Sequence, residues 1–304
     1  MSATDIQIRP RFQWSQAMLH VIFLLLSAAC ILPLVLVVVV SLSDETAVLA
    51  NGFKFFPEKF SLRAYEILFI DYNQIIRSYI VSIIVTVTGT ILSLMITSLF
   101  AYPLSRNDLK YRGVFAFIVF FTLLFNGGLV PTYLLYVNYL HLMDSIWALI
   151  IPLLVTPFYV IIMRTFFATT IPTELIDSSK IDGAGEWYTF MRIVIPLSLP
   201  VLATISLFNT LNYWNDWFLS LLYIDESKNV SLQYLMYKTL NSIQYITSNP
   251  AVMEGISRGG GNLDLPSKTL QMSMAIVGIG PIIFTYPFFQ RYFVKGLTLG
   301  AVKG

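Results

Sequence analysis

The sequence has few of the residues that build metal sites and disulfides. Among 304 residues it holds one cysteine, Cys30, and two histidines, His20 and His141. A single cysteine excludes a disulfide framework or a cysteine-based metal site within one chain. The two histidines lie far apart in the sequence and have no matching ligands near them. We therefore expect no metal site.

Charged residues are also scarce. Asp, Glu, Lys and Arg make up 12% of the chain and hydrophobic residues 56%, whereas a soluble domain usually carries about 25% charged residues. A soluble fold of this length is therefore not expected. The formal net charge is only +2, which gives no sign of a surface that binds nucleic acid.

The common catalytic motifs are missing as well. The sequence contains no GxSxG elbow, no HExxH motif, no Cys–His pair and no GxxxxGK[ST] phosphate loop. Without the last of these, the chain is not expected to hydrolyse ATP on its own. We predict that it is not an enzyme by itself.

What the chain has in abundance is long apolar sequence. A membrane-spanning helix needs roughly 20 mostly apolar residues, and six stretches between consecutive charged residues are long enough. They lie between Arg11 and Asp44, Arg77 and Arg106, Arg112 and Asp144, Asp144 and Arg164, Arg192 and Asp216, and Lys268 and Arg291. The third is interrupted at Asn126-Gly127-Gly128 and Pro131, which predicts a break, and Pro196 and Pro200 predict a kink at the start of the fifth. We interpret Met18–Leu42 as a retained span rather than a cleaved signal.

The basic residues predict the orientation of these spans. Cytoplasmic connections carry an excess of Lys and Arg, and the short, basic connections of this chain fall on one side if both termini are inside. The long connections 43–77 and 223–268, whose charges are balanced, then lie outside the cytoplasm. We predict an all-α integral membrane protein with six transmembrane helices, N-in and C-in, and a single membrane domain over residues 1–304.

A polar stretch between spans four and five, residues 171–200, differs from the rest of the chain. Pro172 and Thr173 begin a short helical pattern, with Glu174 and Asp177 assigned to its first turn, where carboxylates suit the helix dipole. Gly183 and Gly185 predict a helix end and a sharp turn. A second helix is expected to begin near Glu186. We predict a small helix-turn unit on the cytoplasmic face.

This stretch resembles the EAA loop of bacterial ABC importer permeases. Asp177-Ser178-Ser179 is followed by Gly183 and by Ile193-Val194-Ile195-Pro196, with Asp, two serines and Ile195 at positions where the family has Glu, two alanines and Leu. Other segments resemble the carbohydrate-importing branch, in the manner of the maltose importer's second permease subunit, and its subgroup for complex or polymeric saccharides. They are Tyr102–Arg106, Gly127–Tyr133, Met163–Phe167, Ile181–Ala184 and Phe293–Gly304.

The resemblance implies a set of partners. It implies a second homologous permease subunit, two cytoplasmic ATPase subunits that use ATP with Mg, and an extracytoplasmic solute-binding protein, all at the bacterial inner membrane. Residues 171–185 would be the coupling helix that contacts an ATPase. The ATPase-coupling residues would be Glu174, Asp177, Ser178, Ser179, Asp182, Gly183 and Ala184. The subgroup suggests acidic saccharides, such as fragments of alginate or pectin.

The end of the fifth span is the expected substrate path. Polar groups and aromatic rings suit a sugar, whose hydroxyls need hydrogen-bond partners, and polar groups within a membrane usually face a wet interior. The residues assigned to this path are Asn209, Asn212, Tyr213, Trp214 and Asp216. Asn209, Asn212, Tyr213 and Asp216 are expected to lie near one another, at i, i+3, i+4 and i+7 of a helix. For Trp214 and Trp217 a role as interfacial anchors is an equal alternative.

Two other functions remain open at this point. An ion-coupled secondary transporter usually shows internal repeats and intramembrane ionisable groups, whereas here no repeat is evident and Asp216 is nearly alone. A structural membrane scaffold would show no uptake defect on deletion.

Overall fold

The structure is a computed structural model that describes residues 14–225, 227–258, 266–285 and 287–290. Over these residues the regular elements are helices, and the β-type pairing is one isolated bridge between Ser43 and Phe60. The all-α prediction is confirmed. Several features used above lie wholly or partly outside the described residues, namely Arg11, Arg291, the connection 223–268 and the segment Phe293–Gly304.

Three described helical segments are long and apolar enough to cross a membrane: Gln16–Ser41, Arg63–Ser105 and Ser267–Gln290. Three more candidates are pairs of shorter helices joined by a bend, which gives up to six spans if each pair counts as one. The pairs are Arg112–Leu124 with Leu129–Tyr139, Ile146–Leu153 with Pro157–Thr170, and Glu186–Leu197 with Leu199–Asn215.

Two of these bends fall where the sequence predicts them. The first pair is bent by 111° at the Asn126-Gly127-Gly128 interruption, and the last by 79° at Ser198. Ser198 lies between Pro196 and Pro200, and proline both removes a backbone donor and clashes with the preceding helical turn. The sequence-based expectation of a break in span three and a kink in span five is confirmed.

The chain divides into two compact units, and the first contains the described parts of residues 1–70 and 251–277. Its helices are α1 (Trp14–Ser41), α2 (Glu45–Asn51), α3 (Arg63–Leu68), most of α15 (Pro250–Arg258) and the first part of α16 (Ser267–Ile283). Glu45 caps α16, since its carboxylate accepts hydrogen bonds from the backbone N–H groups of Lys268 (2.9 Å) and Thr269 (2.8 Å). A negative charge is favourable at a helix N-terminus.

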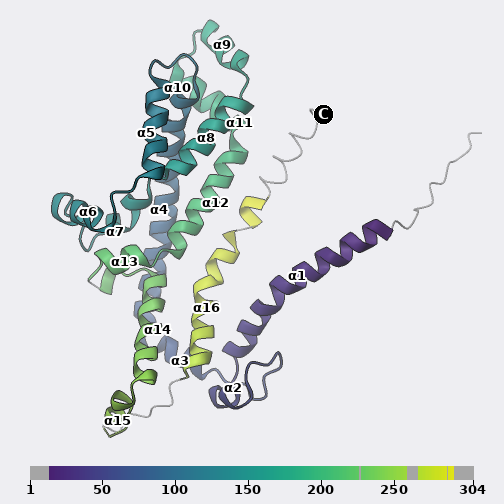
Figure 1. The fold of residues 1–304 in the computed structure, drawn as a ribbon, viewed down its shortest axis with the longest axis vertical. Coiled ribbons are helices and arrows are strands. Elements are labelled where there is room, and N and C mark those ends of the chain that lie inside the picture. The colour runs from purple at the N-terminus through teal and green to yellow at the C-terminus, as the bar shows by residue number, and fades with distance from the viewer. Residues whose placement is uncertain (1–13, 226, 259–265, 286, 291–304) are drawn as a thin grey trace, which may run out of the picture. The chain divides into compact units, whose positions relative to one another are not determined.

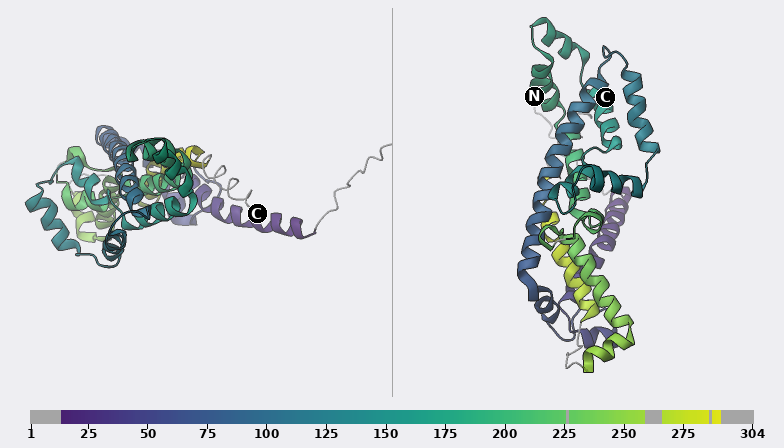
Figure 2. Two further views of the ribbon diagram at one scale, coloured as in Figure 1. Left: turned by 90° about the horizontal axis from the view of Figure 1, so that it is seen from above. Right: turned by 90° about the vertical axis from the view of Figure 1, so that its left-hand side faces the viewer.

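The second unit contains the described parts of residues 71–250 and 278–304. Its longer helices are α4 (Tyr72–Ser105), α5 (Arg112–Leu124), α8 (Pro157–Thr170), α12 (Leu199–Asn215) and α14 (Leu232–Ser248). Shorter helices connect them: α6 (Leu129–Leu134), α7 (Ile146–Ile150), α9 (Thr173–Ile181), α10 (Glu186–Thr189), α11 (Ile195–Leu197) and α13 (Phe218–Tyr223). The long α4 packs against α8 and α12 (Figure 2).

Small residues hold α4 and α12 close together. The buried face of α4 is rich in small and hydroxyl side chains: Ser78, Ser82, Thr86, Gly89, Thr90, Ser93 and Thr97. Such residues let helix backbones approach within a membrane, and their polar groups bond across the contact. Asn209 donates to the Ser93 hydroxyl at 3.0 Å, and the Thr90 and Thr210 hydroxyls lie 3.4 Å apart. Gly89 faces the Tyr213 ring with no room for a side chain between them.

Residues 171–200 lie at one end of this second unit, as a polar extension of an apolar core. That core includes Met163 and Phe167 of α8, Phe190 just after α10, and Ile205 of α12. Ile176 of α9 belongs to the same cluster and is 7% exposed. The short helix α9 is therefore anchored to the helices that carry the membrane-spanning sequence.

Candidate functional site

Helix α9 begins and ends where the sequence predicts. Pro172 is the residue before its first turn, and Asp182 follows its last. Gly183 has a φ of +79°, and the backbone N–H groups of Gly183 and Ala184 donate to the carbonyls of Lys180 (3.0 Å) and Ser179 (2.9 Å). This hydrogen-bond pattern is the Schellman motif, which needs a left-handed residue that glycine adopts without steric cost. Gly185 then precedes α10 at an ordinary φ of −75°.

Helix α9 has two different faces. Glu174, Asp177, Ser178 and Ile181 are all exposed, and their spacing of i, i+3, i+4 and i+7 puts them on one side of the helix. We call these four residues the outer face. Ile181 is 87% exposed, which is unusual for a large apolar side chain. The outer face is thus a mixed polar and apolar surface that nothing in the described chain covers.

The opposite side of α9 faces the protein. Two of the sequence-based assignments, those of Ser179 and Asp177, differ in the structure. Ser179 is buried, and its hydroxyl donates to the Ile176 carbonyl at 2.8 Å and lies 2.9 Å from the Thr189 hydroxyl of α10. It therefore joins α9 to α10 rather than lying on an accessible surface. Asp177 is not in the first turn, because the helix begins only at Thr173 and Glu174 is the acid of that turn.

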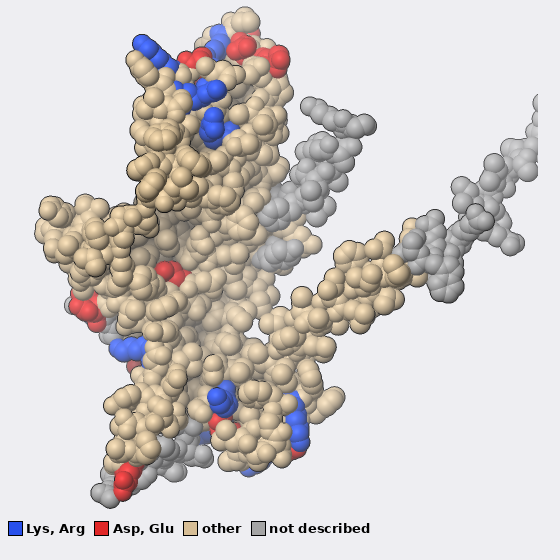
Figure 3. Space-filling view, in the orientation of Figure 1, with Lys and Arg blue, Asp and Glu red and all other residues tan. Residues whose placement is uncertain are grey.

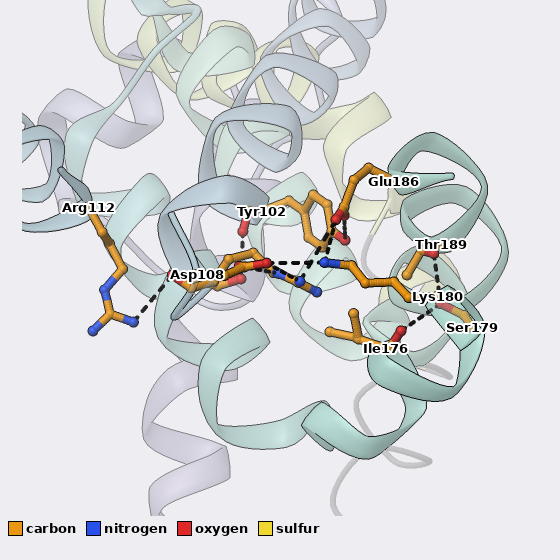
Figure 4. A network of polar contacts seen from close by, with 10 residues as sticks. Tyr102, Asp108, Arg112, Ile176, Ser179, Lys180, Glu186 and Thr189 are labelled. Carbon is orange, nitrogen blue, oxygen red and sulfur yellow. Dashed lines mark hydrogen bonds and ion pairs between the residues drawn. The ribbon is translucent and has the colours of Figure 1, made fainter. Parts of the chain in front are cut away.

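A cluster of charged side chains lies beside α9 (Figure 4). The Lys180 ammonium lies 3.1 Å from Asp108 and 2.9 Å from Glu186. Arg106, which follows α4, contacts Asp108 through two nitrogens at 2.7 and 3.0 Å and reaches Glu186 at 3.8 Å. Each acid therefore contacts both bases. We call Arg106, Asp108, Lys180 and Glu186 the charged ring.

The electrostatics of the ring follow from these contacts. The pKa of the Asp108 carboxyl lies well below its ordinary value because Asp108 accepts hydrogen bonds from Arg106, the larger effect, and from Lys180. The pKa of Lys180 is raised because its ammonium donates hydrogen bonds to Glu186, the larger effect, and to Asp108. All four groups are therefore charged at neutral pH. The Tyr102 hydroxyl of α4 also donates to Glu186 at 2.8 Å.

In Figure 3 charged side chains of the second unit gather at the end that bears α9 and α10, and the surface below this end carries very few charged side chains.

A cavity of about 350 Å³ opens next to the ring. Its walls include Arg106 and Asp108 from the loop after α4, Phe167 and Ile171 from the end of α8, and Asp177 of α9. The cavity therefore lies between the loop after α4, the end of α8 and helix α9.

The candidate path residues on α12 fall into two groups. Asn209, Tyr213 and Trp214 are buried, at 1%, 3% and 4% exposure. Besides the bond from Asn209 to Ser93, the Tyr213 hydroxyl donates to the Ile150 carbonyl (3.0 Å) and the Trp214 indole to the Gly278 carbonyl (3.0 Å). These three side chains bond to neighbouring helices.

Asn212 and Asp216 are more accessible. Asn212 is exposed, and its amide nitrogen donates to the Tyr159 hydroxyl at 2.9 Å. The Tyr159 ring stacks on Phe208 with a centroid separation of 6.2 Å, and Phe208 is 42% exposed. Asp216 lies beyond the last helical residue, Asn215, in extended backbone, so it does not continue the helical spacing that the sequence suggested. Its carboxylate accepts from the Leu219 N–H at 3.2 Å.

Sequence reasoning missed Ile181 and the charged ring. The spacing of Glu174, Asp177 and Ser178 could have indicated Ile181, which continues the same helical face. The ring carries no comparable signal, because Asp108 and Lys180 lie 72 positions apart in the chain. In the described part of the chain, no group of three or more His, Cys, Asp or Glu side chains could hold a metal ion.

Known proteins resemble this chain over nearly its full length. A polygalacturonan/rhamnogalacturonan transport system permease protein of Bacillus subtilis (strain 168) is 42% identical over 284 residues, covering 93% of this chain and 96% of the relative. An arabinooligosaccharides transport system permease protein of the same organism is 28% identical, covering 97% of this chain and 98% of the relative.

One solved structure matches the fold closely. It is the crystal structure of a bacterial ABC transporter involved in the import of the acidic polysaccharide alginate, and one of its chains aligns with a TM-score of 0.75 and 27% identity. The alignment covers 94% of this chain and 100% of that chain. The family model for binding-protein-dependent transport system inner membrane components matches residues 9–299. The chain belongs to this family of inner membrane transport components.

Proposed function

We propose that the chain is the permease subunit of an ATP-driven ABC importer that carries saccharides across the bacterial inner membrane. The observation that carries the proposal is α9, a short helix anchored to the spans on one side and exposed on the other. Such a helix is suited to bind a moving partner and to pass the movement to the spans. The likeness to saccharide permeases supports the choice of cargo.

In this proposal the chain forms half of a translocation pathway. A second homologous permease subunit supplies the other half, two cytoplasmic ATPase subunits bind ATP with Mg, and a solute-binding protein delivers the cargo from outside. The chain has six spans with both termini inside, so that residues 171–185 lie in the cytoplasm. Residues 43–77 and 223–268 lie outside the cytoplasm. Both segments contain helix, because α4 begins at Tyr72 in the first and α14 covers Leu232–Ser248 in the second.

The outer face of α9 is the ATPase-binding surface in this proposal. Glu174, Asp177 and Ser178 supply polar contacts, Ile181 supplies an apolar one, and Asp182, Gly183 and Ala184 form the turn that sets the end of the helix. Ser179 acts from the inside, through its bond to Thr189. An exposed apolar side chain within a polar rim is typical of protein interfaces.

Ile181→Asp tests this surface. A charge at the centre of an apolar contact costs about 1–3 kcal/mol, as buried polar groups do when they lack a partner, so the affinity for the ATPase subunits should fall at least several-fold. The measurement is the amount of ATPase that copurifies with the permease pair. Ile70→Asp is the matched control, because Ile70 is 78% exposed and lies in the predicted outer loop 43–77. Equal copurification of ATPase with both variants would refute the assignment of the outer face.

The likeness to the polygalacturonan/rhamnogalacturonan permease protein and to the alginate importer supports an acidic saccharide as cargo. The side chains on α12 that could touch it are Phe208, Asn212 and Asn215, which are exposed and lie at i, i+4 and i+7 on one face of the helix. A ring and two amides can stack on a sugar and bond to its hydroxyls. Asn209, Tyr213 and Trp214 support this surface from behind, and Asp216 holds the start of α13 through Leu219.

Asn212→Ala should therefore lower uptake at limiting saccharide. Loss of one hydrogen bond, about 0.5–1.5 kcal/mol, corresponds to roughly a 2- to 10-fold rise in the half-saturating concentration of loaded binding protein. Asn73→Ala is the control, since Asn73 is also exposed and lies in the first turn of α4. If uptake by the two variants followed the same saturation curve, Asn212 would not line the path.

A further inference from the structure

Helix α9 is held by more contacts than its apolar anchor. Ile176 fixes one point of the helix in the core, and the Ser179–Thr189 hydrogen bond ties it to α10. Both contacts lie on the same side of α9. With these two contacts alone, the helix could rotate about the line that joins them. Lys180, one residue further on, adds a third point of attachment through the charged ring.

The ring joins three segments that are separate in the chain. Arg106 and Asp108 lie in the loop that follows the long helix α4, Lys180 lies on α9, and Glu186 begins α10. Tyr102, in the last turns of α4, donates to Glu186 as well. The ring therefore connects α9 directly to the end of α4, which in turn packs along α12.

The arrangement of charges in the ring is closed. Each base contacts both acids, at 2.7 and 3.8 Å for Arg106 and at 3.1 and 2.9 Å for Lys180. Removing any one member leaves two like charges that share a single opposite charge, and the ring is then open. Isolated, exposed ion pairs contribute little to folding stability, but a bidentate Arg–carboxylate pair within a network is the exception; the Arg106 side chain is only 13% exposed, so the ring can also stabilise the fold. What a closed ring does fix is geometry, namely the rotation and height of α9 relative to α4.

We propose that Arg106, Asp108, Lys180 and Glu186 are positioning residues that transmit movement between the ATPase-binding helix α9 and the span α4. This inference rests on the proposed function. The four residues lie beside the outer face rather than on it, so they act on α9 and not on the ATPase. With the ring intact, α9 and the end of α4 move as one body when the ATPase closes. With the ring open, α9 turns about its inner contacts and part of the movement is lost.

The experiment uses the complete importer in proteoliposomes and measures saccharide transported per ATP hydrolysed. Lys180→Met should lower this ratio by roughly 2- to 30-fold, the range found when residues that connect two sites are changed, while copurification of the ATPase stays normal. Lys180→Arg keeps the charge and should restore most of the ratio. Lys110→Met removes a charge from the loop before α5, outside the ring, and should leave the ratio unchanged. Glu186→Gln should lower the ratio too, which provides a second variant if Lys180→Met fails to assemble.

Two results would overturn the inference. One is an unchanged ratio in both Lys180→Met and Glu186→Gln. The other is loss of ATPase binding in these variants, which would make the ring part of the contact surface instead of a positioning device. An unaltered importer that moves no saccharide would instead contradict the proposed function, so the two failures are distinguishable.

Discussion

Gly183→Trp is expected to abolish cargo-stimulated ATP hydrolysis while the complex still reaches the membrane. Gly183 has a φ of +79°, where a side chain costs about 1–2 kcal/mol. Relief of that strain would move the Schellman turn that orients the end of α9. The indole would also occupy the open space next to Gly183, two residues from Ile181 of the outer face. The measurement is ATPase activity of the reconstituted importer with and without loaded binding protein.

Two alanine variants separate these effects. Gly183→Ala carries the backbone strain without the bulk, since a Cβ at Gly183 meets nothing within 4 Å, and it should reduce the stimulation several-fold. Gly185→Ala adds the same methyl group at a φ of −75° and also meets nothing within 4 Å, so it should behave as the unchanged protein. Full stimulation in Gly183→Trp would contradict the role given to this turn.

Gly89→Ala adds a single methyl group and is expected to cause a large loss of folding stability. A Cβ at Gly89 would lie 2.5–2.7 Å from atoms of the Tyr213 ring, closer than real contacts allow. Tyr213 is buried and bonded to the Ile150 carbonyl, so the ring has no free direction in which to move. Overpacking of this kind costs about 1–3 kcal/mol. Thermal unfolding in detergent should show a clear decrease in Tm.

A glycine-to-alanine substitution in α16 should have the opposite effect on Tm. Gly280 lies in α16 with open space around its Cβ position, and alanine is the better helix former by about 1 kcal/mol. Gly280→Ala should therefore leave Tm unchanged or raise it slightly. Combining Gly89→Ala with Tyr213→Leu should cost less than the sum of the single changes, because the two residues are in contact. Additive costs would mean that the clash with Tyr213 is not the cause.

The sequence predicts the helical class, the two broken spans and the bounds of α9 because each depends on local chemistry. Apolar run length, proline, and glycine after a polar turn all act within a few residues of where they appear. The helical spacing of Glu174, Asp177 and Ser178 also places them on one face without knowledge of the tertiary structure.

Other features depend on which segments meet in space. Nothing near Ser179 in the sequence indicates that its hydroxyl pairs with Thr189, and nothing near Lys180 indicates Asp108. The division of α12 into buried Asn209, Tyr213 and Trp214 and exposed Asn212 depends on where α4 and α7 pack against it. A list of polar and aromatic residues along one helix therefore mixes exposed side chains with buried ones that hold the helix in place.

The most direct test of the account is uptake by the reconstituted importer, with ATP inside the liposomes and loaded binding protein outside. We expect an acidic oligosaccharide, such as an oligogalacturonide, to accumulate only with ATP, to be blocked by vanadate and to be unaffected by an ionophore. A neutral maltooligosaccharide in the same assay reports on the acidic preference. Uptake that persists with vanadate but is abolished by the ionophore would contradict the central claim and identify an ion-coupled transporter.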